Sequence, residues 1–299
     1  MVFSPVTLDD RDLLHPIIRQ WGFENSDICF SNLLMWQKSI HTRYALTDEA
    51  LFICFDGANQ KLIMQPPVLR QKETNYAIAL QQAIDYFASQ NQIPYFLGVT
   101  ASVRDQIEIA FPNQFDFNHT DSADDYVYAT EKMISLAGKK LHNKRNHINK
   151  FLSFYPYRYE VYQADLHAEA CLELNVRWTE NKDETEGFMS EDARAMECAL
   201  RNASALNMIG GVVFINDQIE AFTLGEQITD SMALIHIEKA NADIPGLYPF
   251  INQTFVETAW PHTTWINREE DMGVENIRRA KESYYPERMI EKYSAKMNA

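Results

Sequence analysis

Long apolar runs and signal-peptide features are missing from this 299-residue sequence. No window of about 18 consecutive residues is apolar throughout, which is the length that a helix needs to span a bilayer. The opening residues 1–6 also lack the basic and apolar regions of a secretory signal. We therefore expect a cytoplasmic chain without a transmembrane segment.

Cysteine is scarce and widely spaced, and it matches no zinc-binding pattern. An even number of cysteines alone does not indicate a disulfide framework in a chain of this length. His142 and His147 lie five residues apart, so they do not share a helix face and make a weak metal pair. We predict no metal site and four free, mostly buried thiols, at Cys29, Cys54, Cys171 and Cys198.

Positive charge is also in short supply, because 27 Lys and Arg stand against 42 Asp and Glu for a formal net charge of -15. Affinity for duplex nucleic acid comes mainly from basic side chains that neutralise phosphates. The composition therefore excludes broad binding to duplex DNA. One basic groove on an acidic body stays compatible with it, and would suit a phosphate-bearing donor such as coenzyme A or the acceptor end of a tRNA.

What the sequence contains is enough apolar material for two packed domains. Hydrophobic residues make up 46%, with 17 Phe, 14 Tyr and 5 Trp. The first half reads as helices near residues 7–18 and 26–40, a strand meander at 44–65, a helix at 73–90, a strand at 95–99 and a helix at 103–110. The acidic segment 115–128 is interpreted as a solvated connection, and the domain boundary is placed near Ala129.

The second half repeats this order without repeating its residues. Helices are predicted near 166–181 and 191–207, a hairpin at 209–215 and 218–227 around Asn216-Asp217, and a strand at 231–239. A helix at 248–259, a strand at 263–268 and a helix at 273–283 follow. We predict two α/β domains (1–129 and 130–299), each a mixed, mainly antiparallel sheet flanked by helices.

A basic stretch, Leu136 to Leu152, is a local exception in this acidic chain, with five Lys or Arg and no Asp or Glu. Leu141, Ile148 and Leu152 recur at helical spacing, and Arg145 falls on the same stripe. A half-buried guanidinium needs a carboxylate or a ligand as its partner. The alternative is an Arg whose stem covers the helix end while its head reaches water.

The block from Thr264 to Gly273 is the second informative place. If strand geometry persists, Trp265, Asn267, Glu269 and Asp271 share one face, which suits binding of an ammonium group. The alternative is a strand end whose solvated acids favour the N-terminus of the next helix.

Other polar residues follow apolar positions nearby. Glu238 ends an apolar strand, either as a candidate general base or as a solvated strand end. In the last predicted helix Arg278 and Lys281 share a side with Tyr284, where they pair with Glu269 or Asp271 or hold an anionic ligand.

Together the blocks resemble an uncharacterised bacterial family that is similar to the C-terminal catalytic region of phosphatidylglycerol lysyltransferases. The residues that carry the resemblance lie at 138–151, 267–273, 277–281 and 283–286. That family resembles tandem GNAT-type acyltransferase domains and the Fem peptidoglycan aminoacyltransferases. The resemblance implies transfer of an acyl or aminoacyl group from acyl-coenzyme A or aminoacyl-tRNA to an amine or hydroxyl, with no tightly bound cofactor.

Residue by residue, the resemblance implies a donor groove, an acceptor pocket and a set of anion-holding or internally paired residues. The donor groove is lined by Lys139, Lys140, Arg145, Asn146 and Asn149. The acceptor pocket comprises Glu238, Asn267, Glu269 and Asp271, with Glu238, Glu269 and Asp271 as catalytic candidates. The remaining substrate-binding candidates are Arg278, Lys281 and Tyr284.

The identity of the donor and two alternative functions stay open at this point. The loop 243–247, where a GNAT phosphate cradle is expected, has one Gly and a Pro without an N–H, which argues against coenzyme A. A non-catalytic protein of the same fold would recognise an aminoacylated or phosphorylated ligand without turnover. A tRNA-binding module would depend on Lys139, Lys140 and Lys144.

Overall fold

The computed structural model describes residues 1–180 and 186–298. The chain forms two compact units. Unit 1 comprises Met1–Asp125, Glu270–Val274 and the residues from Met289 on, and unit 2 comprises Tyr126–Glu269 and Glu275–Arg288. The predicted boundary near Ala129 lies close to Asp125, where the first segment of unit 1 ends. The segment Glu270–Val274 of unit 1 interrupts unit 2 in the sequence, and the last segment of unit 1 follows unit 2. No helix among the described residues is long and apolar enough to cross a bilayer.

The sheet of unit 1 contains strands from both ends of the sequence. Its order is β1-β2-β3-β4-β6-β15-β7, and β5 pairs with β3. The pair β4 and β6 is parallel, with Met64 opposite Phe96, and the other pairings are antiparallel. The strands are β1 Ser4–Pro5, β2 Arg43–Leu46, β3 Ala50–Asp56, β4 Leu62–Met64, β5 Val68–Leu69, β6 Tyr95–Thr100, β7 Phe115–His119 and β15 Lys292–Met297.

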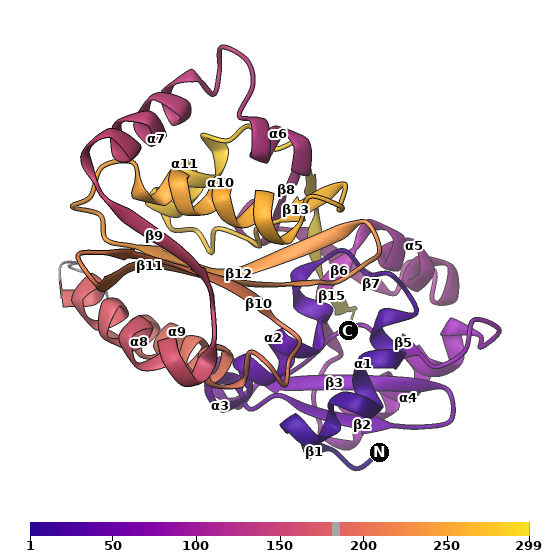
Figure 1. Ribbon diagram of the computed structural model, residues 1–299. Coiled ribbons are helices and arrows are strands. Elements are labelled where there is room, and N and C mark those ends of the chain that lie inside the picture. Colours follow the sequence, from indigo (N-terminus) through magenta and orange to yellow (C-terminus); the bar gives the residue numbers. More distant parts are fainter. Residues whose placement is uncertain (181–185, 299) are drawn as a thin grey trace. The chain divides into compact units, whose positions relative to one another are not determined.

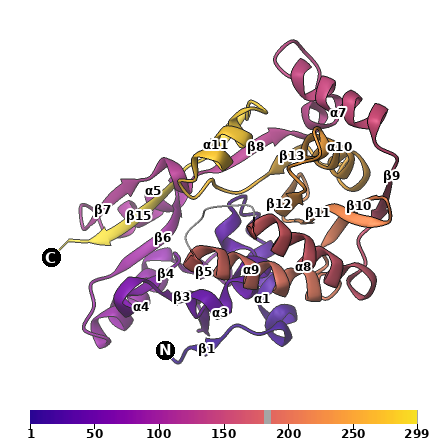
Figure 2. The ribbon, with the colours of Figure 1, turned by 90° about the vertical axis from the view of Figure 1, so that its left-hand side faces the viewer.

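Helices cover both faces of this sheet, with α1 and α4 on opposite sides of β3 (Figures 1 and 2). The helices are α1 Arg11–Arg19, α2 Phe30–Met35, α3 Gln37–Ile40, α4 Tyr76–Ser89 and α5 Ala101–Ala110, with 3-10 turns at Leu8–Asp10, Ser26–Ile28, Ala58–Gln60 and Asp121–Ala123. The predicted helix 26–40 is therefore three short pieces. The start of α4 is fixed by Asn75, whose side chain accepts the Ala77 N–H at 3.0 Å.

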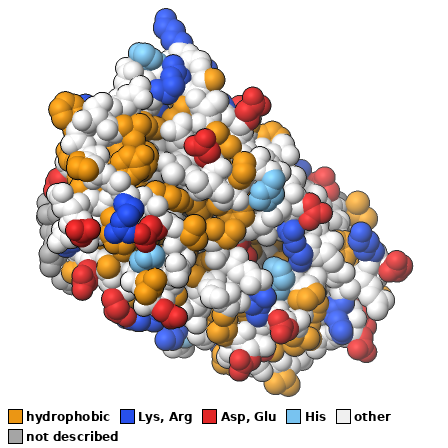
Figure 3. Space-filling model, in the orientation of Figure 1, with side chains coloured by type: hydrophobic (Ala, Val, Ile, Leu, Met, Phe, Trp, Pro, Cys, Tyr) orange, Lys and Arg blue, Asp and Glu red, His pale blue; other side chains and the backbone are white. Residues whose placement is uncertain are grey.

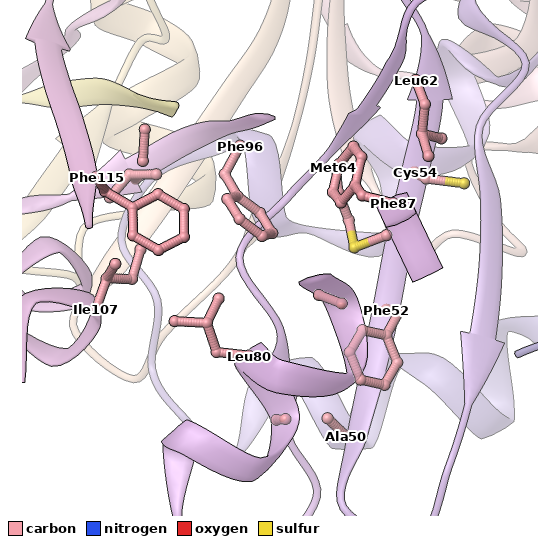
Figure 4. Packing of buried hydrophobic residues seen from close by; sticks show 14 of the residues in the cluster. Ala50, Phe52, Cys54, Leu62, Met64, Leu80, Phe87, Phe96, Ile107 and Phe115 are labelled. Carbon is pink, nitrogen blue, oxygen red and sulfur yellow. The ribbon is translucent and has the colours of Figure 1, made fainter. Parts of the chain in front are cut away.

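The core of unit 1 contains aromatic side chains from α4 and from strands β6 and β7 (Figure 4). Phe87, Phe96 and Phe115 are almost fully buried, and their rings follow one another at centroid distances of 5.7 and 6.0 Å. Truncating one such ring to alanine costs about 3–5 kcal/mol. This cluster therefore anchors the short strands around it.

Unit 2 has a seven-stranded sheet in the order β14-β8-β13-β12-β11-β10-β9. The predicted hairpin is confirmed: β10 and β11 pair antiparallel around Asn216 and Asp217, which both adopt positive φ as a two-residue hairpin turn requires. The pair β12 and β13 is parallel. The strands are β8 Asp125–Ala129, β9 Tyr157–Val161, β10 Ile209–Ile215, β11 Gln218–Gln227, β12 Met232–Ala240, β13 Trp265–Asn267 and β14 Arg288–Ile290.

Helices of unit 2 lie on the two faces of its sheet (Figures 1 and 2). On one face α8 packs against β11 and β12, with α9 beside α8, while α10 packs on the other face together with α6 and α7. The bounds are α6 Thr130–Ser135, α7 His142–Phe154, α8 Ala164–Glu180, α9 Glu186–Asn202, α10 Leu247–Ala259 and α11 Glu275–Glu282. The predicted helix end at Asn181 lies outside the described residues.

Two sequence-based interpretations need correction. The segment 115–128 is not a solvated connection: it contains β7 and most of β8, because its acids have partners. Asp124 accepts the Lys292 N–H at 2.9 Å, and Asp125 contacts the Lys292 ammonium at 2.8 Å. The basic stretch does not begin as a helix either, because Leu136 and Gly138 adopt positive φ and α7 starts only at His142.

Candidate functional site

Polar side chains of unit 2 gather beyond the point where the parallel pairing of β12 and β13 ends. The register of β12 and β13 runs from Met232 opposite Trp265 to Leu234 opposite Asn267. Beyond it β12 continues to Ala240, whereas β13 ends and the chain turns at Glu269 with a φ of 58°. The far half of β12 therefore faces side chains instead of a continuing strand on that side.

Glu238, in this far half of β12, is the centre of the cluster. Its Oε2 accepts a hydrogen bond from Asn252 Nδ2 of α10 at 2.6 Å, and its Oε1 accepts one from Arg268 Nη2 at 3.0 Å. The Glu238 and Arg268 side chains are only 11% and 10% exposed. Removing one partner of such a buried pair costs about 3–5 kcal/mol, because the other charge is left uncompensated.

Two buried atoms of this cluster have no hydrogen-bond partner among the described residues. They are Arg268 Nη1 and Asn252 Oδ1. A buried donor or acceptor without a partner costs about 1–3 kcal/mol, and such groups are rare in folded proteins. The cluster therefore presents one donor and one acceptor that a bound molecule can satisfy.

Lys144 adds an ammonium group to the cluster from α7. Its Nζ lies 4.1 Å from the centroid of the buried Tyr284 ring, and the Arg268 guanidinium lies 5.1 Å from the same ring and 5.8 Å from that of Tyr128. Burial, with a further contribution from the nearby Arg268 charge, lowers the pKa of Lys144 to about 8. A neutral amine is thus accessible near physiological pH.

A second buried group, His236 on β12, holds the turn that follows β13. Its Nδ1 lies 2.8 Å from Glu269 Oε1 and its Nε2 lies 3.0 Å from Glu226 Oε1. Burial disfavours the imidazolium, but the two carboxylates outweigh it and raise the pKa of His236 to about 9. Lys281 of α11 fixes the same turn, because its Nζ donates to the Arg268 carbonyl at 2.6 Å and the Glu269 carbonyl at 3.1 Å.

The N-terminus of α10 is occupied by the protein itself. Pro245 and Pro249 have no N–H, and the N–H groups of Leu247 and Phe250 donate to carbonyls of residues 244 and 246. Gly246 has a φ of +89°, and a Cβ there would lie 2.2 Å from the carbonyl oxygen of His147 in α7. This end of α10 therefore offers few N–H groups for a diphosphate.

Comparison with known proteins assigns the chain to a family. The model of the family "Phosphatidylglycerol lysyltransferase, C-terminal" matches residues 18–296. The chain belongs to this family.

Two individual proteins are also similar to the chain. The chain is 34% identical to a conserved protein of unknown function from Bacteroides thetaiotaomicron, with a TM-score of 0.92 and 99% of each chain covered. An uncharacterized protein of Mycoplasmoides gallisepticum is 25% identical over 180 residues, which are 59% of this chain and 57% of that protein. The aligned part thus spans little more than half of that relative.

More distant solved structures establish the fold. L-PGS from Bacillus licheniformis is 14% identical, with a TM-score of 0.61 over 86% of this chain and 84% of that chain. A tandem GNAT protein from the clavulanic acid biosynthesis pathway is 8% identical, with a TM-score of 0.51 over 100% and 99%. The fold is that of two tandem GNAT-like domains, as the sequence predicted.

In this family member the predicted donor-groove residues lie on α7 and the loop before it. Arg145 is half-buried, but Nη1 donates to the main-chain carbonyls of Leu136 and Gly138 (to Gly138 at 3.0 Å) and to no carboxylate among the described residues. It ties the preceding loop to the first turn of α7. Lys139 and Lys140 are exposed in the loop before α7. Figure 3 shows Lys and Arg side chains at the top of the face that it views.

Asn146 and Asn149 are exposed on α7. The Asn146 amide lies 3.0 Å from His142 Nε2, and the Asn149 carbonyl accepts the Ser153 hydroxyl at 2.8 Å. Both side chains are thus on the solvent side of the helix, away from its buried residues Ile148 and Phe151.

The predicted strand face does not persist past β13. Asn267 is fully buried, and its Oδ1 accepts the Glu269 N–H at 2.7 Å, which starts the turn. Asp271 is fully buried in unit 1, where its Oδ1 accepts the Gly273 N–H at 2.8 Å. Arg278 lies half-buried on α11. The turn at Glu269 thus separates Asn267 and Asp271, which the alternation of a continuing strand would have placed on one face.

Sequence reasoning missed several central residues. Arg268 was not singled out from the sequence, and its neighbour Glu269 gives no residue-type signal for a positive φ. Lys144 was considered only as a residue of a tRNA-binding module, although it lies three residues after Leu141. Asn252, a fully buried amide between apolar residues of α10, was the available signal that was not used.

Proposed function

We propose that this family member is an acyl- or aminoacyltransferase whose reaction centre is the cluster around Glu238 in unit 2. The observation that carries the proposal is the pair of buried atoms without partners, Arg268 Nη1 and Asn252 Oδ1, beside an amine with a lowered pKa. A hydrogen-bond donor, a hydrogen-bond acceptor and a base therefore lie close together, which is the combination of groups that acyl transfer uses.

In the proposed reaction the acceptor's nitrogen or oxygen attacks the carbonyl carbon of the donor. Arg268 Nη1 donates to the carbonyl oxygen, where negative charge develops. Neutral Lys144 takes the proton from the attacking group and returns it to the leaving oxygen or sulfur as the donor ester or thioester bond breaks. Asn252 Oδ1 accepts a hydrogen bond from the amino or hydroxyl group of a substrate.

Glu238 acts in this proposal as a positioning residue, because its two oxygens fix Asn252 Nδ2 and Arg268 Nη2 and leave the other atom of each group facing the substrate. Glu269 fixes the turn that carries Arg268 through its contact with His236. Asp271 has no catalytic role in this proposal. It is a structural residue of the turn before α11, where its Oδ1 accepts the Gly273 N–H.

An aminoacyl-tRNA is the favoured donor over acyl-coenzyme A. The main-chain N–H groups at the N-terminus of α10 that would hold a diphosphate are partly absent and partly used, and the His147 carbonyl packs against Gly246. Exposed Lys139 and Lys140 supply positive charge that tRNA phosphates can contact instead.

Transfer from labelled donors tests the proposal. Purified protein is incubated with tRNA charged with a mixture of ¹⁴C-labelled amino acids, or with ¹⁴C-acetyl-coenzyme A, and with a protein-free cell extract as the source of acceptors. We expect label to leave aminoacyl-tRNA for a new product, and Lys144→Met to slow the transfer about 100-fold or more. Lys150→Met, an exposed lysine on the same helix, is the matched control and should stay within about twofold.

The outcomes separate the candidate functions. Label that leaves acetyl-coenzyme A alone would overturn the choice of donor. Binding of aminoacyl-tRNA without any transfer would favour the non-catalytic binding protein. Transfer by Lys144→Met at the unchanged rate would remove Lys144 from the mechanism.

A further inference from the structure

Strand β9 is the outer strand of the sheet of unit 2 (Figures 1 and 2). It pairs with β10 on one side, and no described strand pairs with its other edge. Proteins commonly protect such an edge with a proline, a bulge or charged side chains. No proline lies within β9, and its pairing with β10 is uninterrupted from Tyr157 opposite Ile215 to Val161 opposite Gly211. Only the charges of the strand are left to decide which partner the edge accepts.

The main-chain groups of β9 point alternately to its two edges. Tyr162, the residue after the strand, donates its N–H to the Gly210 carbonyl of β10 at 2.9 Å. Because the direction of hydrogen bonding alternates along an antiparallel pair, residues 158 and 160 also bond to β10. The N–H and C=O groups of Tyr157, Tyr159 and Val161 therefore point to the edge that faces away from β10, where another strand can bond to them.

The side chains of these three residues leave the edge accessible. Tyr159, in the middle of the strand, bends back across β10, because its ring lies against Gly211 and its Oη lies 3.1 Å from Thr258 Oγ1 of α10. Tyr157 and Val161, at the two ends, are 42% and 61% exposed. A second strand at this edge would cover their apolar surface.

The charges of β9 make the strand complementary to itself in one register. Arg158 and Glu160 lie on the face opposite Tyr159, contact each other and are 51% and 37% exposed. When a second β9 runs antiparallel with Tyr159 opposite Tyr159, each Arg158 lies opposite Glu160 of the second copy. Tyr157 then lies opposite Val161. A shift of two residues in either direction places Arg158 opposite Arg158, or Glu160 opposite Glu160, and like charges directly opposite are destabilising.

We propose that β9 pairs with β9 of a second copy of this chain, in a symmetric dimer whose two-fold axis passes beside Tyr159. The register agrees with the main-chain directions, because the opposed pairs 157 with 161 and 159 with 159 are those whose N–H and C=O groups point outward. Arg158 and Glu160 form the alternate pairs, in which opposed side chains come closest. Such an interface uses the same patch on both copies. The dimer does not depend on the acyl transfer proposed for the Glu238 cluster.

Sedimentation equilibrium of the full chain measures the association. A pair of five-residue strands makes a small interface, so we expect a dimer with a Kd of about 10–100 µM. The average mass should rise from the 34.7 kDa of one chain toward twice that value as the concentration increases. A mass that stays at 34.7 kDa up to about 300 µM would overturn the proposal.

Charge reversal tests whether β9 is the interface. Arg158→Glu and Glu160→Arg each place like charges opposite one another and should raise the Kd at least about tenfold. The double variant with both changes restores opposite charges in the same register, so its Kd should return to within about threefold of the wild type. Arg279→Glu is the matched control, because Arg279 is an exposed arginine of α11 that also pairs with a glutamate, and it should leave the Kd unchanged.

Mixing the two single variants gives a second, independent readout. An equimolar mixture of Arg158→Glu and Glu160→Arg should associate although neither variant does so alone at the same concentration, because each Glu then faces an Arg of the other chain. Thermal melts show that each variant is folded. A wild-type dimer that neither single variant weakens lies on another surface and would refute the proposal, as would folded single variants that fail to associate when mixed.

Discussion

Replacing Lys144 by methionine removes a charge that the fold holds at a cost. Burial lowers the pKa of this lysine from 10.5 to about 8. At about 1.36 kcal/mol for each pH unit, the difference corresponds to about 3 kcal/mol, part of which is offset by the contact with the Tyr284 ring. We expect Lys144→Met to raise the free energy of unfolding at pH 7 by about 1–3 kcal/mol.

The pH dependence has a definite sign. Because the pKa of the folded state lies below that of the unfolded chain, the unfolded chain binds an extra proton between pH 8 and 10.5. The penalty is complete below pH 8 and disappears as pH rises to 10.5. The gain from Lys144→Met should therefore shrink between pH 7 and pH 10.

Urea denaturation of both proteins at these two pH values, with Lys150→Met as the control, measures the effect. A Lys144→Met protein that is less stable than the wild type at pH 7 would refute the reasoning. It would mean that the ammonium contributes favourable contacts that exceed the cost of its burial.

Three further predictions concern stability. Lys292→Met should lower the free energy of unfolding by about 3–5 kcal/mol in urea denaturation, because it strands buried carboxylates; a loss below 1 kcal/mol would contradict this. Folding raises the pKa of His236 from 6.5 to about 9, so the protonated His236 stabilises the fold. This contribution is complete below pH 6.5 and is lost as pH rises through 9. Stability measured from pH 6 to 9.5 should therefore fall more steeply in the wild type than in His236→Gln, and parallel curves would argue against it. Gly246 and Gly138 both have a φ of +89°, but only at Gly246 would an added Cβ clash with the His147 carbonyl. Thermal melts should therefore show Gly246→Ala less stable than Gly138→Ala by about 1–3 kcal/mol. Equal melting temperatures would exclude the clash.

The elements with strong local signals were predictable from the sequence. The hairpin around Asn216-Asp217 was found because two residues that tolerate positive φ separate two apolar runs. The tandem fold followed from the repeated order of helices and strands together with the resemblance. The turn signal of the hairpin lies within a few residues of the structure that it specifies.

Features that depend on distant partners were not predictable in this way. The turn at Glu269 relies on Asn267, His236 and Lys281, and Glu is not a residue type that favours positive φ. The acids at 124 and 125 read as solvated because their partner, Lys292, lies far along the sequence. Arg145 was correctly placed on the inner stripe, but its partners turned out to be main-chain carbonyls of the preceding loop.

Strand β15 lies between β6 and β7 in the sheet of unit 1, although all of unit 2 precedes it in the sequence. During synthesis the N-terminal part of a chain ordinarily folds first. Here a ribosome must deliver residues 292–297 before β6 and β7 gain the strand between them, and before Lys292 reaches Asp27 and Asp125. The last strands of the chain, β14 and β15, thus complete the two sheets almost together, and until then unit 1 exposes unpaired edges of β6 and β7 to chaperones or to aggregation.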